Sequence, residues 1–308
     1  MTHRVTKITD FEPKVSSHTE QQTSNSRQIS SFDVLKGLKI QVTNSFAIQF
    51  SYLSQLLQFA ASNCDKHRIP RPEFVAHLGL TKRHVEALCS VAVAFNLINA
   101  RKLTATQVGK TIAEWDPYLE YVGTLWILHY NVASNKRWLI WNTMMNELFP
   151  TKRRMTSEGI KASFDHLRGK LSKSTMTKKI PREIAIILDA YTTKAFSKLA
   201  ILRKENNTYI YRRATQIPPE ILAAISLIFG KGSSPNASGI SMEALIRAPN
   251  SPGRILNLEE STVRRVLDRS SQEGLLYVER KADLDQIRFK EGVTIEFLLE
   301  KYYEGIKK

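Results

Sequence analysis

The sequence predicts a mainly α-helical protein with small β wings, in which two winged-helix (helix-turn-helix) modules flank a basic helical segment. Three observations lead to this prediction. Residues 70–112 suggest two short helices joined by a tight turn and followed by a hairpin pattern. Residues 240–289 repeat this order of signals, and the stretch between the two patterns is rich in cations. We therefore divide the chain into a disordered arm (1–30), an N-terminal winged-helix domain (31–150), a basic helical segment (151–213) and a C-terminal winged-helix-like domain (214–308).

The composition narrows the class of protein. The chain has 308 residues and carries 45 lysines and arginines against 29 acidic residues, a net charge of +16 that favours polyanionic partners. Residues 1–30 are polar, with few large apolar groups, which is typical of disorder. No apolar run reaches the ~18 residues that span a bilayer, and no secretory signal is recognisable. Two isolated cysteines, Cys64 and Cys89, favour neither a disulfide framework nor a zinc site, so we expect a cytoplasmic protein without membrane contact.

The N-terminal module begins with a helix expected over residues 46–61. Its apolar side chains recur at helical spacing: Phe46, Phe50, Leu53, Leu57 and Ala60. Pro72 can occupy the first turn of a short second helix, and Gly79 can end that helix in a left-handed conformation. Thr81 is then the expected N-cap of a helix over 82–95, which completes a helix-turn-helix.

A short wing is expected after this helix. Residues 97–98 and 102–103 can pair across a turn at 99–100, and Thr104 with Gln107 has the spacing of a capping box for the next helix. On DNA, the start of the recognition helix would enter a major groove while the wing reaches phosphates. The residues expected at DNA are Lys82, Arg83, His84, Arg101 and Lys102. The alternative is a module that packs only against protein.

The middle segment holds most of the charge excess, with 16 basic and 5 acidic residues in 151–213. Cations there alternate with hydroxyl side chains that can bond phosphate oxygens. We expect the following residues to grip a DNA backbone: Lys152, Arg153, Arg154, Arg168, Lys170, Lys173, Lys178 and Lys179. The alternative is a solvated, solubilising linker. Helical spacing of Ile184, Ile187, Leu188 and Tyr191 argues against a pure linker.

The last third of the chain repeats the helix-turn-helix theme. A short helix around 242–247 is followed by a Pro/Gly turn and a second helix, for which Asn257 and Glu260 have the spacing of a capping pair. Val263, Val266 and Leu267 should face inward on that helix. Residues 276–279 and 286–289 should then pair as a wing. Because residues 214–308 have no net charge, dimerisation or partner docking is as well supported there as a DNA role.

Residues 115–130 are dense in aromatic side chains and include Asp116, Glu120 and His129. Two carboxylates and an imidazole can bind a divalent metal, such as Mg²⁺, that activates water against a phosphodiester. These three are the candidate catalytic residues. In the favoured alternative, Asp116 before Pro117 is a helix N-cap and the aromatic residues are core. The chain lacks the nucleophile elbow, the HExxH helix and the Walker A loop, which disfavours hydrolases of those classes and nucleotide hydrolysis.

Most of residues 46–300 resembles a bacterial family known as domain of unknown function four thousand and seven. The resemblance rests on a Gly- and Lys-containing turn into the recognition helix, on the Asp-Pro-Tyr-Leu-Glu and Gly-Thr-Leu-Trp motifs with a following His, and on a late Ser-Pro-Gly. Those places are held by Gly79, Lys82, Val85, 116–120, 123–126, His129 and 251–253. The resemblance implies a DNA phosphorothioation and defence locus, beside sulfur-transfer proteins similar to phosphoadenosine phosphosulfate reductase. One member of the family nicks DNA in a single-strand phosphorothioate modification system.

Together, the residues and the resemblance lead to three hypotheses. The first is a DNA-binding accessory protein of phosphorothioate modification, with a possible Mg²⁺-dependent nicking activity. The second is an adaptor that docks sulfur-transfer proteins, and the third is a winged-helix transcription regulator. A homodimer is compatible with each of them.

Overall fold

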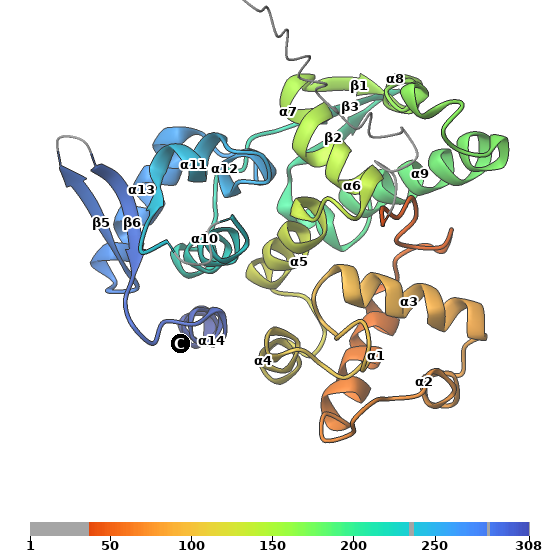
Figure 1. The fold of residues 1–308 in the computed structure, drawn as a ribbon, viewed down its shortest axis with the longest axis horizontal. Helices are drawn as coiled ribbons and strands as arrows, with labels where there is room; N and C mark the ends of the chain where they lie inside the picture. Colours follow the sequence, from red (N-terminus) through yellow and green to blue (C-terminus); the bar gives the residue numbers. More distant parts are fainter. Residues whose placement is uncertain (1–36, 234–236, 282–283, 308) are drawn as a thin grey trace, which may run out of the picture. The chain divides into compact units, whose positions relative to one another are not determined.

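The computed structural model describes residues 37–233, 237–281 and 284–307, and the arm predicted for residues 1–30 lies outside them. The described part is mostly helical and contains two small, three-stranded antiparallel sheets (Figure 1). This confirms the predicted mainly α-helical class with small β elements. Residues 37–308 form one compact unit, so the proposed boundaries at 150 and 213 stay predictions.

The N-terminal part consists of five helices: α1 (Phe50–Ser62), α2 (Arg71–Leu78), α3 (Lys82–Ala94), α4 (Gln107–Trp115) and α5 (Val122–Ser134). Pro72 lies in the first turn of α2, and Gly79 ends that helix with φ 64°. The Thr81 side chain caps α3 by accepting a hydrogen bond from the His84 N–H at 3.4 Å. The helix and turn signals of residues 70–95 are therefore confirmed.

Three local predictions in this part are wrong. The first helix begins at Phe50 rather than Phe46. The wing is reduced to one bridge between Ile98 and Ala105, because Leu103 adopts a left-handed φ of 59° that interrupts an extended strand. The cap of α4 is not Thr104, which is buried, but Thr106, whose Oγ1 accepts the Gly109 N–H at 2.9 Å.

The middle segment contains a sheet that the sequence reasoning missed. Strands β1 (Arg154–Thr156), β2 (Leu202–Glu205) and β3 (Thr208–Tyr211) pair in the order β1-β3-β2. The helices α6 (Leu139–Thr143), α7 (Phe149–Thr151), α8 (Ser157–Ala162) and α9 (Ile180–Thr192) lie around it, with π-helical turns at Met144–Leu148 and Thr175–Lys179 and 3₁₀ turns at Asp165–Leu167 and Ala195–Leu199. The segment is thus mixed rather than helical throughout. The predicted inward face of α9 is confirmed, because Ile184, Ile187, Leu188 and Tyr191 are all buried.

The C-terminal part begins with α10 (Pro219–Ser233), and its sheet has the order β4-β6-β5. The remaining elements are β4 (Ile240–Ser241), α11 (Met242–Arg247), α12 (Pro252–Ile255), α13 (Glu260–Gln272), β5 (Leu276–Lys281), β6 (Leu284–Phe289) and α14 (Ile295–Lys307). The predicted hairpin is confirmed, with Leu276 opposite Phe289. The inward face of α13 is confirmed too, but Asn257 does not cap it: its side chain donates to the Arg212 carbonyl at 2.9 Å.

The nearly all-buried helix α5 holds these parts together. It packs against α6, α10 and α12, while α14 returns to lie against α4 and α10, as Figure 1 shows. The Gly123 N–H donates to Tyr302 Oη at 2.9 Å, and Thr124 and Tyr303 share a hydrogen bond of 2.7 Å. Gly123 is required at this crossing because a Cβ there would overlap the Tyr302 ring.

Candidate nucleic-acid interface

The start of α3 presents two of the three side chains predicted to meet DNA. Lys82 and Arg83 are exposed, and neither forms an ion pair with a described residue. His84 is different, because its ring stacks on Phe46 at 4.6 Å between centroids and meets the edge of Tyr52. The His84 ring is therefore committed to packing, while Lys82 and Arg83 stay available to an anion.

The two predicted wing cations also lie on the surface. Arg101 and Lys102 are exposed, and their backbone N–H groups donate to Asn99 Oδ1 at 2.9 and 3.1 Å. The Lys102 carbonyl accepts the Ile69 N–H at 2.8 Å, which ties this turn to the residues before α2. Without a strand pair, a compact turn rather than an extended wing carries these cations.

The middle segment exposes cations that lack acidic partners. Of its sixteen lysines and arginines, only Arg154, Arg168, Arg203 and Arg213 form ion pairs with described residues. The Arg154–Glu205 separation is 3.8 Å, and the Arg168–Asp165 pair spans three residues at 2.8 Å. The predicted backbone-gripping residues without such a pair are Lys152, Arg153, Lys170, Lys173, Lys178 and Lys179; Lys170 is half-buried and the others are exposed.

One of the five acidic residues in this segment lies away from its surface cations. Glu183 is fully buried on α9, where Oε1 accepts the Val42 N–H at 2.8 Å and Oε2 accepts the Thr43 hydroxyl at 2.7 Å. Burial raises the pKa of Glu183, and these hydrogen bonds oppose the rise. Glu183 therefore anchors residues 42–43 to α9 and is shielded from the surface cations.

The helix-turn-helix and the middle segment meet at one small cavity. Its volume is about 300 Å³, and Arg83 from α3 and Lys179 before α9 both line it, together with Glu86 and residues 41, 44 and 45. Arg182 on the next turn donates from Nε to the Ser45 carbonyl at 3.3 Å. The structure therefore brings Arg83 and Lys179, which are almost one hundred residues apart in the sequence, to the same cavity.

In the C-terminal part, more of the cations are paired with carboxylates. Five of the seven arginines in residues 214–308 form ion pairs with described carboxylates. Arg264, for example, contacts both Glu260 at 3.0 Å and Asp285 at 2.7 Å. An anion would have to compete with these partners. Described cations without an ion pair are thus more frequent on the middle segment than on the C-terminal part.

Asp116 has a structural role that differs in detail from the predicted cap. It follows the last residue of α4, and its side chain accepts the N–H groups of Glu120 at 2.9 Å and Tyr121 at 3.0 Å. Tyr121, not Asp116, is the N-cap residue of α5. Asp116 thus fixes the turn between the two helices with both carboxylate oxygens, while the Glu120 side chain is exposed.

His129 is buried in a chain of hydrogen bonds between α5, α6, α9 and α12. Its Nε2 lies 3.1 Å from the Ile255 carbonyl, which can only accept, so the neutral ring carries its proton on Nε2. Nδ1 then accepts from the Tyr191 hydroxyl, which itself accepts the Trp141 indole N–H at 3.0 Å. Burial lowers the pKa of His129 to about 4.

These three residues do not fit a magnesium site. No group of three or more His, Cys, Asp or Glu side chains suited to a metal occurs in the part of the chain that the structure describes. Both Asp116 oxygens accept backbone N–H groups, and both ring nitrogens of His129 are occupied. Mg²⁺ also prefers oxygen ligands. The catalytic assignment stays a prediction, and the geometry favours the structural alternative.

Comparison with known proteins identifies the family. Residues 43–303 match the model of a family described as "Protein of unknown function (DUF4007)". The chain belongs to this family. Two solved structures are similar in fold: "Magnesium ion-bound SspB crystal structure", with a TM-score of 0.69, and "SspB crystal structure", with a TM-score of 0.67. Each is 18% identical over 87% of this chain and 89% of the other. No curated protein matches.

Sequence reasoning missed three cations that the fold gathers near α3. Lys39, Arg71 and Arg137 line one cavity, although they are far apart in the sequence. No periodicity or motif relates these positions, so only the tertiary structure reveals them.

None of the helices in the described part of the chain combines the length and the apolar composition that a membrane span requires.

Proposed function

We propose that this DUF4007 protein is a DNA-binding accessory protein of a DNA phosphorothioate modification and defence system. It holds nucleic acid through phosphate contacts from the middle segment and from Lys82 and Arg83 on α3. The observation that carries the proposal is the contrast in charge pairing: twelve of the sixteen lysines and arginines of 151–213 form no ion pair with a described residue, whereas six of the twelve described ones in 214–307 are paired.

Counterion release gives this proposal a quantitative signature. Each phosphate that a cation neutralises on duplex DNA contributes about −0.9 to the slope of log K against log salt concentration. Cations already held by carboxylates contribute less, because their own pairs must first break. The unpaired cations should therefore set the salt dependence of binding.

The test compares two variants that lose the same formal charge. The first replaces Lys152, Arg153, Lys170 and Lys173 with Gln, and the control replaces the ion-paired Arg247, Arg269, Arg280 and Arg288 with Gln. Fluorescence anisotropy of labelled duplex and single-stranded DNA, between about 50 and 300 mM NaCl, gives the slopes. The first variant should flatten the slope by roughly one unit for each phosphate that is no longer neutralised, and the control should change it much less. Equal changes in both variants, or a flat slope in the wild type, would contradict the proposal.

The link to phosphorothioation rests on the family and on the fold shared with SspB. In this proposal the C-terminal elements from α10 to β6 act as a winged helix, and the helix-turn-helix of α2 and α3 acts as a second such module with a reduced wing. Sulfur-transfer proteins similar to phosphoadenosine phosphosulfate reductase are the proposed partners. Co-purification of such a protein from cells, surviving nuclease treatment, tests the partnership. Loss of the complex on nuclease treatment would show that DNA alone joins the two.

The C-terminal hairpin favours a second, docking function. Tyr277 on β5 is 53% exposed and Leu284 on β6 is 39% exposed, beside arginines that are paired internally. Exposed apolar side chains among neutralised charges suit a protein partner or a second copy of the chain better than a phosphate backbone. Tyr277→Ser should weaken a homodimer or a partner complex in sedimentation velocity and leave DNA binding unchanged; the reverse pattern would exclude the docking role.

A further inference from the structure

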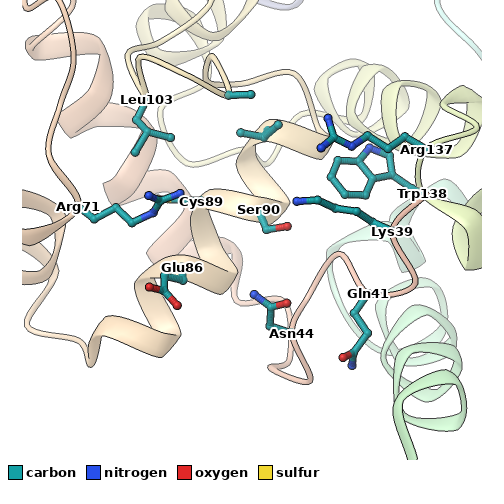
Figure 2. Close-up of a pocket in the computed structure, with 12 residues that line it drawn as sticks. Lys39, Gln41, Asn44, Arg71, Glu86, Cys89, Ser90, Leu103, Arg137 and Trp138 are labelled. Carbon is teal, nitrogen blue, oxygen red and sulfur yellow. The ribbon is translucent and has the colours of Figure 1, made fainter. Parts of the chain in front are cut away.

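A basic pocket lies beside α3, next to the small cavity that Arg83 and Lys179 line, and shares Gln41, Asn44 and Glu86 with it. Its volume is about 520 Å³, and three cations line it: Lys39, Arg71 and Arg137. Figure 2 shows Lys39 and Arg71 reaching toward Ser90 from opposite sides, with Arg137 above them. Glu86 is the one carboxylate among the described lining residues, so the charged lining has a net charge of +2.

The three cations come from three separate segments of the chain, two of which are joined by backbone hydrogen bonds. The Lys39 N–H donates to the Arg137 carbonyl at 2.7 Å, and the Leu139 N–H donates to the Lys39 carbonyl at 3.1 Å. Lys39 Nζ and Arg137 Cζ also lie 5.4 and 5.6 Å from the centre of the buried Trp138 ring. Arg71 is the first residue of α2. Lys39 and Arg137 are therefore positioned by the backbone and by cation–π contacts before any ligand arrives, whereas the exposed Arg71 side chain is placed by the start of α2 alone.

The positive charge of the pocket is offset only in part by the described residues that line it. None of the three cations forms an ion pair with a described residue, and their like charges repel each other. The pKa of Lys39 is lowered first by burial and then by the positive charges of Arg137 and Arg71. Glu86 is too far from each of them for an ion pair. A bound anion would relieve this repulsion.

The other polar groups of the pocket are suited to binding rather than to chemistry. The Ser90 hydroxyl and the Asn44 side-chain amide have no hydrogen-bond partner among the described residues and can bond oxygens of a ligand. The Cys89 thiol also lies at the wall, but burial raises its pKa to about 11. It is a poor nucleophile in this state.

We propose that this pocket is a binding site for a phosphate group, either of a small molecule or of a nucleic-acid strand. Two guanidinium groups and an ammonium group provide bidentate and single hydrogen bonds to tetrahedral oxygens, and Ser90 and Asn44 complete the donor set. The volume exceeds that of one phosphate group, so there is room for the group that carries it. No cation of the middle segment lines this pocket; Lys179 lines the neighbouring cavity, which shares Gln41, Asn44 and Glu86 with it.

Calorimetric titration with pyrophosphate and with adenosine 5′-monophosphate tests the site, with adenosine as the uncharged control. The variants are Lys39→Gln, Arg71→Gln and Arg137→Gln, and the matched control is Lys136→Gln, an exposed lysine next to Arg137 that does not line the pocket. Each lining variant should weaken anion binding roughly tenfold or more, since a charge-assisted hydrogen bond is removed. Ser90→Glu, which places a carboxylate in the pocket, should abolish binding. Circular dichroism melting confirms that each variant folds.

The same variants distinguish the two sources of the phosphate. If a small molecule supplies it, the lining variants lose pyrophosphate or adenosine monophosphate binding and keep wild-type affinity for an oligonucleotide. If a strand supplies it, they lose affinity for the oligonucleotide, and added pyrophosphate competes with the strand in the wild type. Absence of anion binding in the wild type together with unchanged oligonucleotide affinity in all four lining variants would overturn the proposal. Equal weakening by Lys136→Gln would overturn it too.

Discussion

Removing one hydroxyl group from the buried network around His129 should cost the fold several kcal/mol. In the wild type the Tyr191 hydroxyl accepts the Trp141 indole N–H and donates to His129 Nδ1. Tyr191→Phe leaves both of those buried atoms without a partner. Each unsatisfied buried group costs about 1–3 kcal/mol, so the free energy of unfolding should fall by about 2–6 kcal/mol.

The assay is urea unfolding followed by tryptophan fluorescence and by circular dichroism. With an m value of about 3 kcal/mol/M, the midpoint should fall by roughly 1–2 M while m stays unchanged. Tyr209→Phe is the matched control. Tyr209 is half-buried on β3, and its hydroxyl forms no hydrogen bond with a described residue. Its loss should change the stability by less than about 0.5 kcal/mol. Equal effects of the two substitutions would refute the network.

The same network predicts how stability depends on pH. Burial lowers the pKa of His129 to about 4, below the usual value of 6.5, so the unfolded chain binds the proton more readily between these values. His129 therefore does not reduce the free energy of unfolding above pH 6.5. As the pH falls from 6.5 toward 4, its burial as a neutral ring lowers the free energy of unfolding by about 3 kcal/mol in total. Glu183, whose pKa burial raises, acts in the opposite sense, with a contribution that is lost as the pH rises. Subtracting the pH profile of His129→Gln from that of the wild type isolates the histidine; a flat difference would refute its burial as a neutral ring.

Two further substitutions test the structural assignments near α5. Gly123→Ala should destabilise the protein by about 1–3 kcal/mol in thermal melts, because the added methyl group overlaps the Tyr302 ring. The control is Gly232→Ala near the end of α10, where a Cβ meets no neighbouring atom; it should be neutral or slightly stabilising in the same experiment. Asp116→Asn should lower stability by about 1–2 kcal/mol, because the single amide oxygen can accept only one of the Glu120 and Tyr121 N–H groups and leaves the other without an acceptor, and it should leave unchanged any nicking of supercoiled plasmid in Mg²⁺. Loss of nicking in a folded Asp116→Asn or Glu120→Gln variant would restore the catalytic assignment.

Local signals in the sequence predicted local structure well. Pro72, Gly79 and Thr81 determine the ends of α2 and α3 through φ restriction, a left-handed residue and a side-chain cap, and each effect needs only neighbouring residues. The same logic located the hairpin of β5 and β6. It misplaced the cap of α4 by two residues because the Leu103 backbone conformation depends on how this turn packs.

The missed features depend on residues distant in the sequence. β1 is three residues long and pairs with a strand more than fifty residues later, so no pattern within residues 151–165 could reveal it. The β2–β3 hairpin could have been predicted from the sequence, since Asn206, with a φ of 51°, starts a turn before the strand-forming Thr208–Tyr211. The basic pocket could not have been predicted, because Lys39, Arg71 and Arg137 converge only in the folded chain.

The motif by which the chain resembles its family is a motif of the scaffold. Asp116 ties the turn before α5, Gly123 admits the Tyr302 ring, and His129 connects α9 to α12. Each polar atom named there already has its partner inside the protein, and such an atom can take a ligand only by giving that partner up. The groups with unused bonding capacity are the cations of the middle segment and of the basic pocket. Family membership therefore identifies the fold, whereas the cations proposed to bind phosphate lie, with the exception of Lys82, outside the positions that carry the resemblance.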